Sequence, residues 1–338
     1  MRLVVTGGLG FIGSNFVRLV LERRPDWCLT NLDLVTYAGN PANLEDVASH
    51  PRYRFVKGDV ADRADLARAL EGGADAIVNF AAETHVDRSI LAAGPFVRTN
   101  VLGAVQVLEA ARALGRCRVV HVSTDEVYGA LGPGDPPCTE ATALNPTSPY
   151  AASKAAADHL ALAFARTHGQ DVVVTRCSNN YGPYQFPEKL IPLTVTNAVE
   201  GKRLPVYGDG RQMRDWIHVA DHCAGVLAAL ERGRAGEVYH FGGHAERANL
   251  DIVSRIVVLT GVAPGLIEHV ADRPAHDRRY ALDAAKAERE LGWRPARAFE
   301  EGLADTVRWY VEHESWWRPV KDGSYRDFYR TWYEERVP

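Results

Sequence analysis

The chain has few cysteines and no long apolar run. Its five cysteines are odd in number, lie far apart and include no Cys-x-x-Cys pair: Cys28, Cys117, Cys138, Cys177 and Cys223. A disulfide framework or a zinc site is therefore not expected, and we predict no bound metal. No apolar run is long enough to span a bilayer, and a strand-like segment follows Met1 directly, which leaves no room for a signal peptide. We expect a cytoplasmic protein with reduced thiols.

An excess of charge of one sign is also missing. The 338 residues carry 39 basic and 43 acidic side chains, a formal net charge of −4. This near balance gives no sign of a nucleic-acid or membrane surface, so we expect neither as a partner. Internal repeats and low-complexity linkers are absent too, and the length suits one large domain or two moderate ones.

What the sequence does contain begins with a glycine-rich turn. A short β-branched strand runs into Gly7-x-x-Gly10-x-x-Gly13, and a helical pattern continues through about Arg23. Glycines at this spacing allow a tight turn and let a pyrophosphate approach backbone N–H groups at a helix N-terminus. Asp33 follows Gly13 by 20 positions and ends a second strand at residues 28–32. Its carboxylate is placed to accept from a ribose hydroxyl and to repel a 2′-phosphate, which favours NAD over NADP.

Strands and helices then alternate regularly. Further strands are predicted at residues 53–56, 76–82, 118–124, 171–177 and 238–241, with a long helix at 95–114. This alternation predicts an α/β fold, a Rossmann-type doubly wound parallel sheet with helices on both faces. Residues 1–178, with 217–242 returning, form the predicted NAD-binding domain. Residues 179–216 and 243–338 form a smaller mixed α/β substrate domain, in which Trp309, Trp316, Trp317 and Trp332 are expected to pack rather than bind.

A tyrosine and a lysine stand at i and i+4 in Ser148-Pro149-Tyr150-Ala151-Ala152-Ser153-Lys154. Ser148 is a suitable N-cap, and Pro149 suits the first helical position. Tyr150 and Lys154 then share one helix face. In isolation the pair is typical of a solvated helix face. Beside a dinucleotide, Lys154 and an oxidised nicotinamide are expected to lower the pKa of the Tyr150 phenol and make it a base.

Two adjacent carboxylates follow the apolar strand at 118–124, in Ser123-Thr124-Asp125-Glu126-Val127-Tyr128-Gly129. In a partly dry pocket the pKa values of Asp125 and Glu126 should separate, which provides one acid and one base at the same pH. An exposed acidic turn is the simpler alternative. Adjacent residues on a regular strand also point to opposite faces, so both can serve one substrate only if the chain leaves strand geometry after Thr124.

Together these motifs resemble the extended short-chain dehydrogenase/reductase family. The glycine-rich turn, Asp33, Asn79-Phe-Ala-Ala-Glu-Thr-His, Tyr-x-x-x-Lys and Asn179-Asn180-Tyr181-Gly182-Pro183 carry the resemblance. Thr124-Asp125-Glu126 narrows it to the sugar-nucleotide 4,6-dehydratases, since related 4-epimerases lack the Asp-Glu pair. The segments 82–89, 184–190 and 276–280 are similar to the same enzymes, so the resemblance covers essentially the whole chain.

The resemblance implies a homodimeric lyase of deoxysugar biosynthesis, such as that of rhamnose, which dehydrates dTDP-glucose to dTDP-4-keto-6-deoxyglucose with tightly bound NAD. In that reading C4 is oxidised, water is eliminated across C5 and C6, and hydride returns to C6. Tyr150 takes the proton of the 4-hydroxyl, and Thr124 hydrogen-bonds the 4-oxygen. Lys154 holds Tyr150 and the nicotinamide ribose. Glu126 is the base at C5, and Asp125 is the acid at the C6 hydroxyl.

Two sets of binding residues follow. The cofactor set is Gly7, Gly10, Phe11, Ile12, Gly13, Asp33, Leu34, Thr36, Asp59, Val60, Ala81, Ala82, Glu83, Thr99, Ser123, Tyr150, Lys154 and Asn179. The substrate set is Thr84, His85, Asn180, Glu188, Lys189, Leu190, Pro205, Val206, Tyr207, Arg214, Asn249, Arg273, His276 and Tyr280, with Arg214 and Arg273 as candidates for the diphosphate. A 4-epimerase or decarboxylase on the same scaffold is the enzymatic alternative. A non-catalytic NAD-binding protein is the other.

Overall fold

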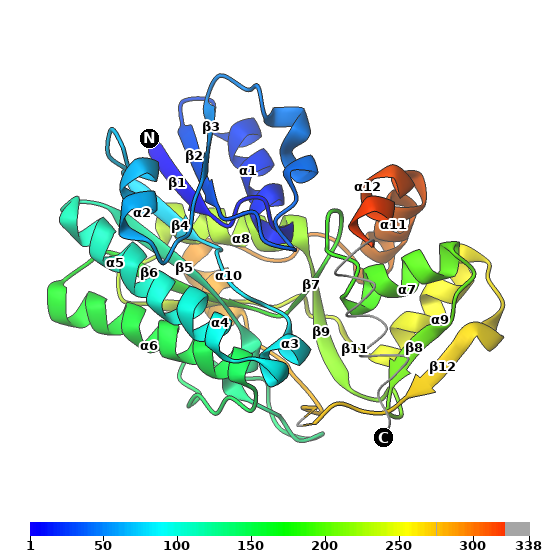
Figure 1. Cartoon of the computed structure of the whole chain (residues 1–338). Helices are drawn as coiled ribbons and strands as arrows, with labels where there is room; N and C mark the ends of the chain where they lie inside the picture. The colour runs from blue at the N-terminus through cyan, green and yellow to red at the C-terminus, as the bar shows by residue number, and fades with distance from the viewer. Residues whose placement is uncertain (275, 322–338) are drawn as a thin grey trace.

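A seven-stranded parallel sheet dominates the computed structural model, which describes residues 1–274 and 276–321 (Figure 1). Its strand order is β10-β6-β5-β4-β1-β2-β3, which confirms the predicted Rossmann-type doubly wound sheet. The strands are β1 (Arg2–Thr6), β2 (Cys28–Asp33), β3 (Tyr53–Lys57), β4 (Ala76–Asn79), β5 (Arg118–Thr124), β6 (Val172–Cys177) and β10 (Val238–Phe241). The order reverses between β1 and β4, which is where such sheets bind dinucleotides.

Helices cover both faces of this sheet because its strands are apolar on both sides. Val5 and Val120 face one cluster, which includes α1 (Phe11–Arg23), α8 (Val219–Arg232) and α10 (Ala285–Leu291). Val4 and Val119 face the other, with α2 (Arg63–Ala69), α5 (Gly103–Ala113) and α6 (Pro149–His168). The alternation along each strand therefore fills two separate cores.

Two predicted segments differ in detail. The fourth strand ends at Asn79 rather than at 82, because residues 80–82 leave the sheet. The helix predicted at 95–114 consists of α4 (Gly94–Phe96), a π-helical segment η2 (Val97–Leu102) and α5. Within η2, Asn100 accepts from the Glu83 backbone N–H (2.8 Å) and donates to Ser153 Oγ (2.8 Å). The π segment thus connects the loop after β4 to α6.

Shorter helices also belong to the larger unit of the fold, which contains the seven-stranded sheet. They are the 3₁₀-helix η1 (Pro41–Val47), α3 (Val86–Leu91) and the 3₁₀-helix η3 (Asp125–Tyr128). The predicted cap of α6 is confirmed, since Ser148 accepts from the Ala151 backbone N–H and Pro149 is the first helical residue. None of the helices in the described ranges is long and apolar enough to cross a membrane.

A smaller unit lies beside the large sheet, on the right in Figure 1. It holds a three-stranded sheet in the order β11-β9-β7 and a two-stranded sheet, β12-β8. Its elements are β7 (Asn179–Tyr181), α7 (Leu190–Val199), β8 (Leu204–Tyr207), β9 (Met213–His218), β11 (Glu246–Ala248), α9 (Asn249–Thr260), η4 (Pro264–Leu266), β12 (Ile267–Val270), α11 (Phe299–Glu312) and α12 (Glu314–Val320).

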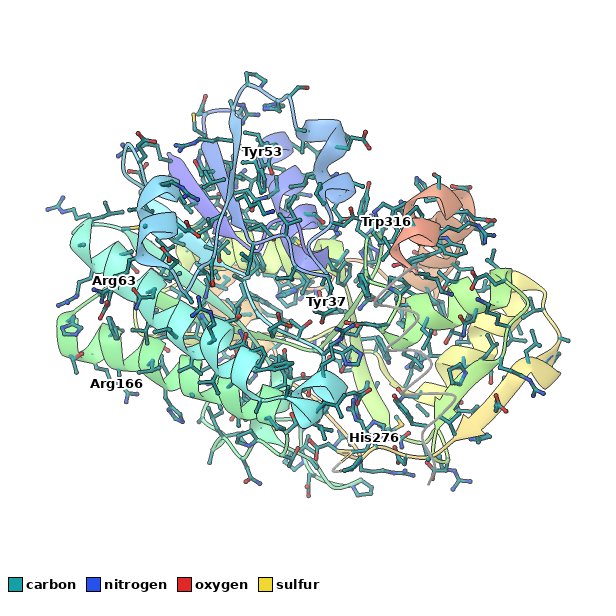
Figure 2. All side chains as sticks on the ribbon, in the orientation of Figure 1. Tyr37, Tyr53, Arg63, Arg166, His276 and Trp316 are labelled. Atoms are coloured by element: carbon teal, nitrogen blue, oxygen red, sulfur yellow. The ribbon has the colours of Figure 1, made fainter. Side chains whose placement is uncertain are left out.

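Aromatic residues form much of the core of the smaller unit. Tyr181, Tyr310 and Trp317 are almost completely buried in one cluster, and Trp309 and Trp316 pack at its edge, as expected from the sequence. Trp316, labelled in Figure 2, also donates from its indole nitrogen to Asn43 of η1 (2.8 Å). Trp332 lies outside the described residues. Within residues 243–338, which the sequence assigns mainly to the substrate domain, α10 packs against the large sheet through Ala287 and Leu291.

Candidate active site

A cavity lies at the carboxyl ends of the strands of the large sheet. Loops that follow six strands, β1 to β6, line it, and the segment 185–189 closes it from the side of the smaller unit. Tyr37, labelled in Figure 2, lies between the two units, and its hydroxyl donates to Glu188 Oε1 (3.3 Å). The cavity is therefore shared by both parts of the chain.

The glycine-rich turn forms the floor next to β1. Gly7 has φ +71°, and a Cβ at this position would collide with the Ala81 backbone. A Cβ on Gly13 would lie 2.2 Å from the Gly7 carbonyl oxygen, so α1 can approach the turn only without a side chain there. A Cβ on Gly10 would meet only that same carbonyl and would project into the cavity. The turn thus leaves a cradle at the N-terminus of α1 that fits a pyrophosphate.

Asp33 lies at the end of β2, on the rim of the same cradle. Its carboxylate accepts from the backbone N–H groups of Leu9 (2.9 Å) and Val35 (2.8 Å). Burial raises the pKa of Asp33, while these two hydrogen bonds favour its ionised form. An oriented carboxylate at this place suits a ribose hydroxyl and opposes a 2′-phosphate.

All residues predicted to bind the cofactor line the cavity. Besides the glycines and Asp33, they are Phe11, Ile12, Leu34, Thr36, Asp59, Val60, Ala81, Ala82, Glu83, Thr99, Ser123, Tyr150, Lys154 and Asn179. Cys177, Ser178, Gln185 and Phe186 line it as well and were not predicted individually. The sequence signal for Gln185 and Phe186 was their place in the family-like segment 184–190, whereas Cys177 and Ser178 follow from the end of β6.

Tyr150 and Lys154 project from the first turns of α6 into the cavity, as their spacing predicted. Lys154 Nζ donates to the carbonyl of Val122 on β5 (2.7 Å), and both side chains are buried. The predicted lowering of the Tyr150 pKa requires Lys154 together with an oxidised nicotinamide, and the protein alone does not produce it. Burial, followed by the nearby Glu126, raises this pKa well above the usual value. A cation next to the phenol, such as a nicotinamide ring, is needed to offset this.

The chain does leave strand geometry directly after Thr124. Asp125 begins η3, whose N-cap is Thr124: its hydroxyl oxygen accepts from the Glu126 backbone N–H (3.3 Å). Gly129 ends the turn with φ +73°. Because the backbone coils here, Asp125 and Glu126 both line the cavity, together with Tyr150. The two side chains therefore do not point to opposite faces, as adjacent residues of a regular strand would.

The two carboxyls have different surroundings. Burial and the neighbouring Glu126 hold the pKa of Asp125 well above its usual range. Burial also raises the pKa of Glu126, but Arg273, Lys189 and Arg214 oppose that rise. The pKa of Asp125 is therefore raised strongly, whereas cations beside Glu126 oppose the effect of burial on that carboxyl. The sequence predicted different surroundings for the two carboxyls, and their assignment as acid and base stays a prediction.

Four members of the predicted substrate set line the cavity: Thr84, Asn180, Glu188 and Lys189. Lys189 Nζ donates to the Thr84 carbonyl (3.0 Å), which connects the two sides of the cavity. Burial raises the pKa of Glu188 to about 7.

A second group lies behind the carboxylate pair. Arg214 is buried with its guanidinium 4.2 Å from the centroid of the Tyr280 ring, and it donates to two backbone carbonyls. Arg273 Nη1 lies 3.5 Å from Asp87 Oδ1, and Asp87 also accepts from the Tyr207 hydroxyl (3.0 Å). Both arginines are near enough to Glu126 to affect its pKa.

The remaining predicted residues lie farther from the cavity. His85 caps α3 beside Glu188, and Leu190 begins α7. Val206 is buried in an apolar cluster next to Pro205 on β8, while Asn249 begins α9. His276, labelled in Figure 2, bonds to Asp272 Oδ1 (2.5 Å). Among the described residues, no group of three or more His, Cys, Asp or Glu side chains could hold a metal ion.

The fold and this site define a class: extended short-chain dehydrogenase/reductase enzymes that act on nucleotide sugars. Within it, the chain belongs to the GDP-mannose 4,6 dehydratase family, whose model matches residues 4–306. The dTDP-glucose 4,6-dehydratase of Streptomyces antibioticus is 54% identical, with 95% of this chain and 96% of the relative covered. That of Streptomyces niveus is 52% identical with the same coverage. A crystal structure of the Streptomyces venezuelae enzyme with NAD and TYD bound is 54% identical, covers 95% of this chain and 100% of its own, and superposes with a TM-score of 0.92.

Proposed function

We propose that this protein dehydrates dTDP-glucose to dTDP-4-keto-6-deoxyglucose with NAD that stays bound and is regenerated in each turnover. The observation that carries this proposal is η3, which turns both Asp125 and Glu126 toward the cavity beside Tyr150. Elimination across C5 and C6 requires an acid and a base in addition to the group that serves C4. Relatives of the same name, similar over nearly the whole chain, support the substrate.

The glycine-rich turn, Asp33 and the other lining residues would hold NAD in the cradle described above. When bound, NAD accepts the hydride from C4 and returns a hydride to C6. Tyr150 takes the proton of the 4-hydroxyl, and Thr124 donates to the 4-oxygen. Lys154, fixed by the Val122 carbonyl, adds a positive charge beside the phenolate.

A ketone at C4 acidifies the proton on C5. Glu126 removes this proton, and protonated Asp125 donates its own proton to the C6 hydroxyl, which leaves as water. Glu126 later returns a proton to C5, Tyr150 releases the proton of the 4-hydroxyl to solvent, and Asp125 is reprotonated from solvent. The high pKa of Asp125 supports its role as the acid, and the three cations around Glu126 support its role as the base.

The substrate diphosphate is assigned to Arg214 and Arg273, because paired guanidinium donors match its geometry. Thr84, Asn180, Glu188 and Lys189 would contact the sugar end. Pro205, Val206, Tyr207 and Asn249 would line the nucleotide end. The other candidates for substrate binding are His85, Leu190, His276 and Tyr280. A cytoplasmic location belongs to the same proposal, and a homodimer stays a prediction.

A 4-epimerase on this scaffold would need Tyr150, Lys154 and NAD but no C5 chemistry. Glu126→Gln separates the two functions. The variant should still oxidise C4, so mixing it with dTDP-glucose should build up the absorbance of the reduced cofactor. Its rate of product formation should fall by about 10²–10⁴-fold, as expected for loss of a positioned base. The variant should also not exchange the C5 hydrogen with deuterated water.

Asp125→Asn is the matched control, since it removes the acid and leaves the base. This variant should exchange the C5 hydrogen but fail to expel the C6 hydroxyl. Product mass and deuterium content, measured for the wild type and both variants, decide between the functions. Unchanged turnover of Glu126→Gln, with deuterium still entering C5, would contradict the dehydratase assignment.

A further inference from the structure

A row of buried polar side chains lies behind the cavity and touches neither substrate nor cofactor space. Tyr128 ends η3, Arg176 lies on β6 and Asp158 lies on α6, and none of the three lines the cavity. Their exposed fractions are 6%, 3% and 0%. A buried guanidinium and a buried carboxylate are costly to place inside a protein, so their position calls for an explanation.

The hydrogen bonds among these groups have a single consistent direction. Arg176 donates from Nε to Asp158 Oδ2 (2.8 Å) and from Nη1 to the Tyr128 hydroxyl oxygen (2.5 Å). His240 Nδ1 faces the Asp283 carbonyl (3.1 Å), which can only accept, so this nitrogen carries the proton. His240 Nε2 is therefore an acceptor, and the Tyr128 hydroxyl donates to it (2.6 Å).

Burial supports this arrangement of protons. It lowers the pKa of His240 to about 3, so the imidazole is neutral, and it raises the pKa of Tyr128, so the phenol keeps its proton. Within the row, the positive charge of Arg176 then faces the negative charge of Asp158, which the buried Lys154 also affects. The Tyr128 hydroxyl uses one donor and one acceptor position, which satisfies its hydrogen-bonding capacity within the row.

The row joins the two catalytic elements. Asp158 follows Lys154 by one turn of α6 and Tyr150 by two, so all three lie on one helix face. Tyr128 follows Glu126 by two residues in a single turn of 3₁₀-helix. Val127 and Tyr128 also pack in one cluster with Ala155 of α6. Arg176 therefore forms a polar bridge between α6, which carries Tyr150 and Lys154, and η3, which carries Asp125 and Glu126.

We propose that Tyr128, Arg176 and Asp158 form a positioning unit that fixes the turn of Asp125 and Glu126 relative to Tyr150 and Lys154. A single 3₁₀ turn has weak hydrogen-bond geometry and adapts easily. At its start it is held by Thr124, and at its end by the Gly129 N–H bond to Glu126 and by the Tyr128 hydroxyl. Loss of the hydroxyl contact should misplace the two carboxyls while leaving α6 in position. The inference rests on the proposed dehydration.

Tyr128→Phe tests this unit, with three readouts on the full-length protein loaded with NAD. After mixing with dTDP-glucose, the reduced cofactor should appear at a rate within about twofold of the wild type. Exchange of the C5 hydrogen and release of product should slow by about 10–100-fold, because small displacements of reacting groups cost this much. KM should change little, since the row touches no substrate.

Tyr239→Phe is the matched control, because the Tyr239 side chain is also buried and its hydroxyl also makes two hydrogen bonds, with Arg234 N and Glu290. It should lower the thermal midpoint to a similar degree without changing the ratio of the oxidation and elimination rates. Arg176→Lys keeps the charge opposite Asp158 but loses the fork that reaches Tyr128. It should reproduce the selective loss, and the double variant should be no slower than the slower single one.

Equal slowing of oxidation and elimination in Tyr128→Phe, or no slowing of either, would overturn the positioning role. So would a selective loss in Tyr239→Phe of the same size. If the wild-type protein forms no 4-keto-6-deoxy product from dTDP-glucose, the proposed function is refuted instead. The wild-type assay is therefore carried out first.

Discussion

At the scale of single residues, three of the acidic groups that line the cavity, Asp125, Glu126 and Tyr150, have different environments. Asp125 is buried beside Glu126, and these two effects outweigh the nearby Arg214, so its protonated form is favoured. Burial raises the pKa of Glu126 as well, but three nearby cations oppose that rise. Tyr150 remains a neutral phenol in the protein alone. In the proposed mechanism, proton removal at the 4-hydroxyl therefore needs a cation supplied with the cofactor in addition to Lys154, whereas the proton transfers at C5 and at the C6 hydroxyl use Glu126 and Asp125.

Tyr150→Phe tests the first half of this division. The ring packs against Phe96 with a centroid separation of 6.3 Å, and phenylalanine retains that contact. Turnover should fall by about 10²–10⁴-fold, as expected for loss of a positioned base, while KM and the thermal midpoint stay nearly unchanged. Steady-state kinetics combined with a thermal unfolding scan measure both. Wild-type turnover would exclude Tyr150 as the base.

At the scale of elements, the 3₁₀ turn η3 decides what the site can do. Its formation follows from local chemistry: Thr124 caps the turn, and Gly129 ends it in a backbone conformation that other residues avoid. The carbonyl of Asn145 closes the space beside Gly129, since a Cβ there would lie 2.2 Å from that oxygen.

Gly129→Ala should therefore destabilise the protein and slow elimination. We expect a loss of about 2–4 kcal/mol in the free energy of unfolding, because an unfavourable φ and a backbone collision add together. Gly169→Ala is a suitable control: Gly169 ends α6 with φ +61°, and a Cβ there meets nothing within 4 Å. It should cost only about 1 kcal/mol. Urea unfolding measures the difference, and equal costs would contradict the collision.

Local sequence patterns predicted most of the large sheet, because apolar strands, capped helices and glycine turns are set by near neighbours. Ser148, Gly7 and Asp33 are examples in which the predicted feature appears in the structure. The π segment η2 and the packing of α10 on the large sheet were not predicted, since both depend on contacts between residues far apart in the chain. For the same reason, no local sequence pattern predicted the contacts of Arg176, because its partners Asp158 and Tyr128 lie 18 and 48 positions away.

At the scale of the whole molecule, many histidines are buried in the neutral form. Burial lowers the pKa of His222 and His240 to about 3 and that of His218 to about 4. An unfolded histidine binds a proton below about pH 6.5. Each of these groups therefore contributes stability that is fully present above pH ~6.5 and is lost as the pH falls toward its folded pKa. The buried carboxyls with raised pKa values, such as Glu188, act in the opposite direction.

A substitution at His218 measures the contribution of a single buried histidine to the pH dependence of stability. It caps α8, with Nδ1 accepting from the Ala220 backbone N–H (3.2 Å), and asparagine can make the same cap without titrating. His218→Asn loses the ring contact with Tyr181, so its stability should be lower at every pH. Between about pH 7 and pH 5, however, the wild type should lose about 2 kcal/mol more than the variant, because only the wild type gains a proton at this position on unfolding. Urea unfolding at several pH values gives the two curves, and the same change at exposed His159 controls for surface effects. Curves that stay parallel over this range would show that folding does not depress the pKa of His218.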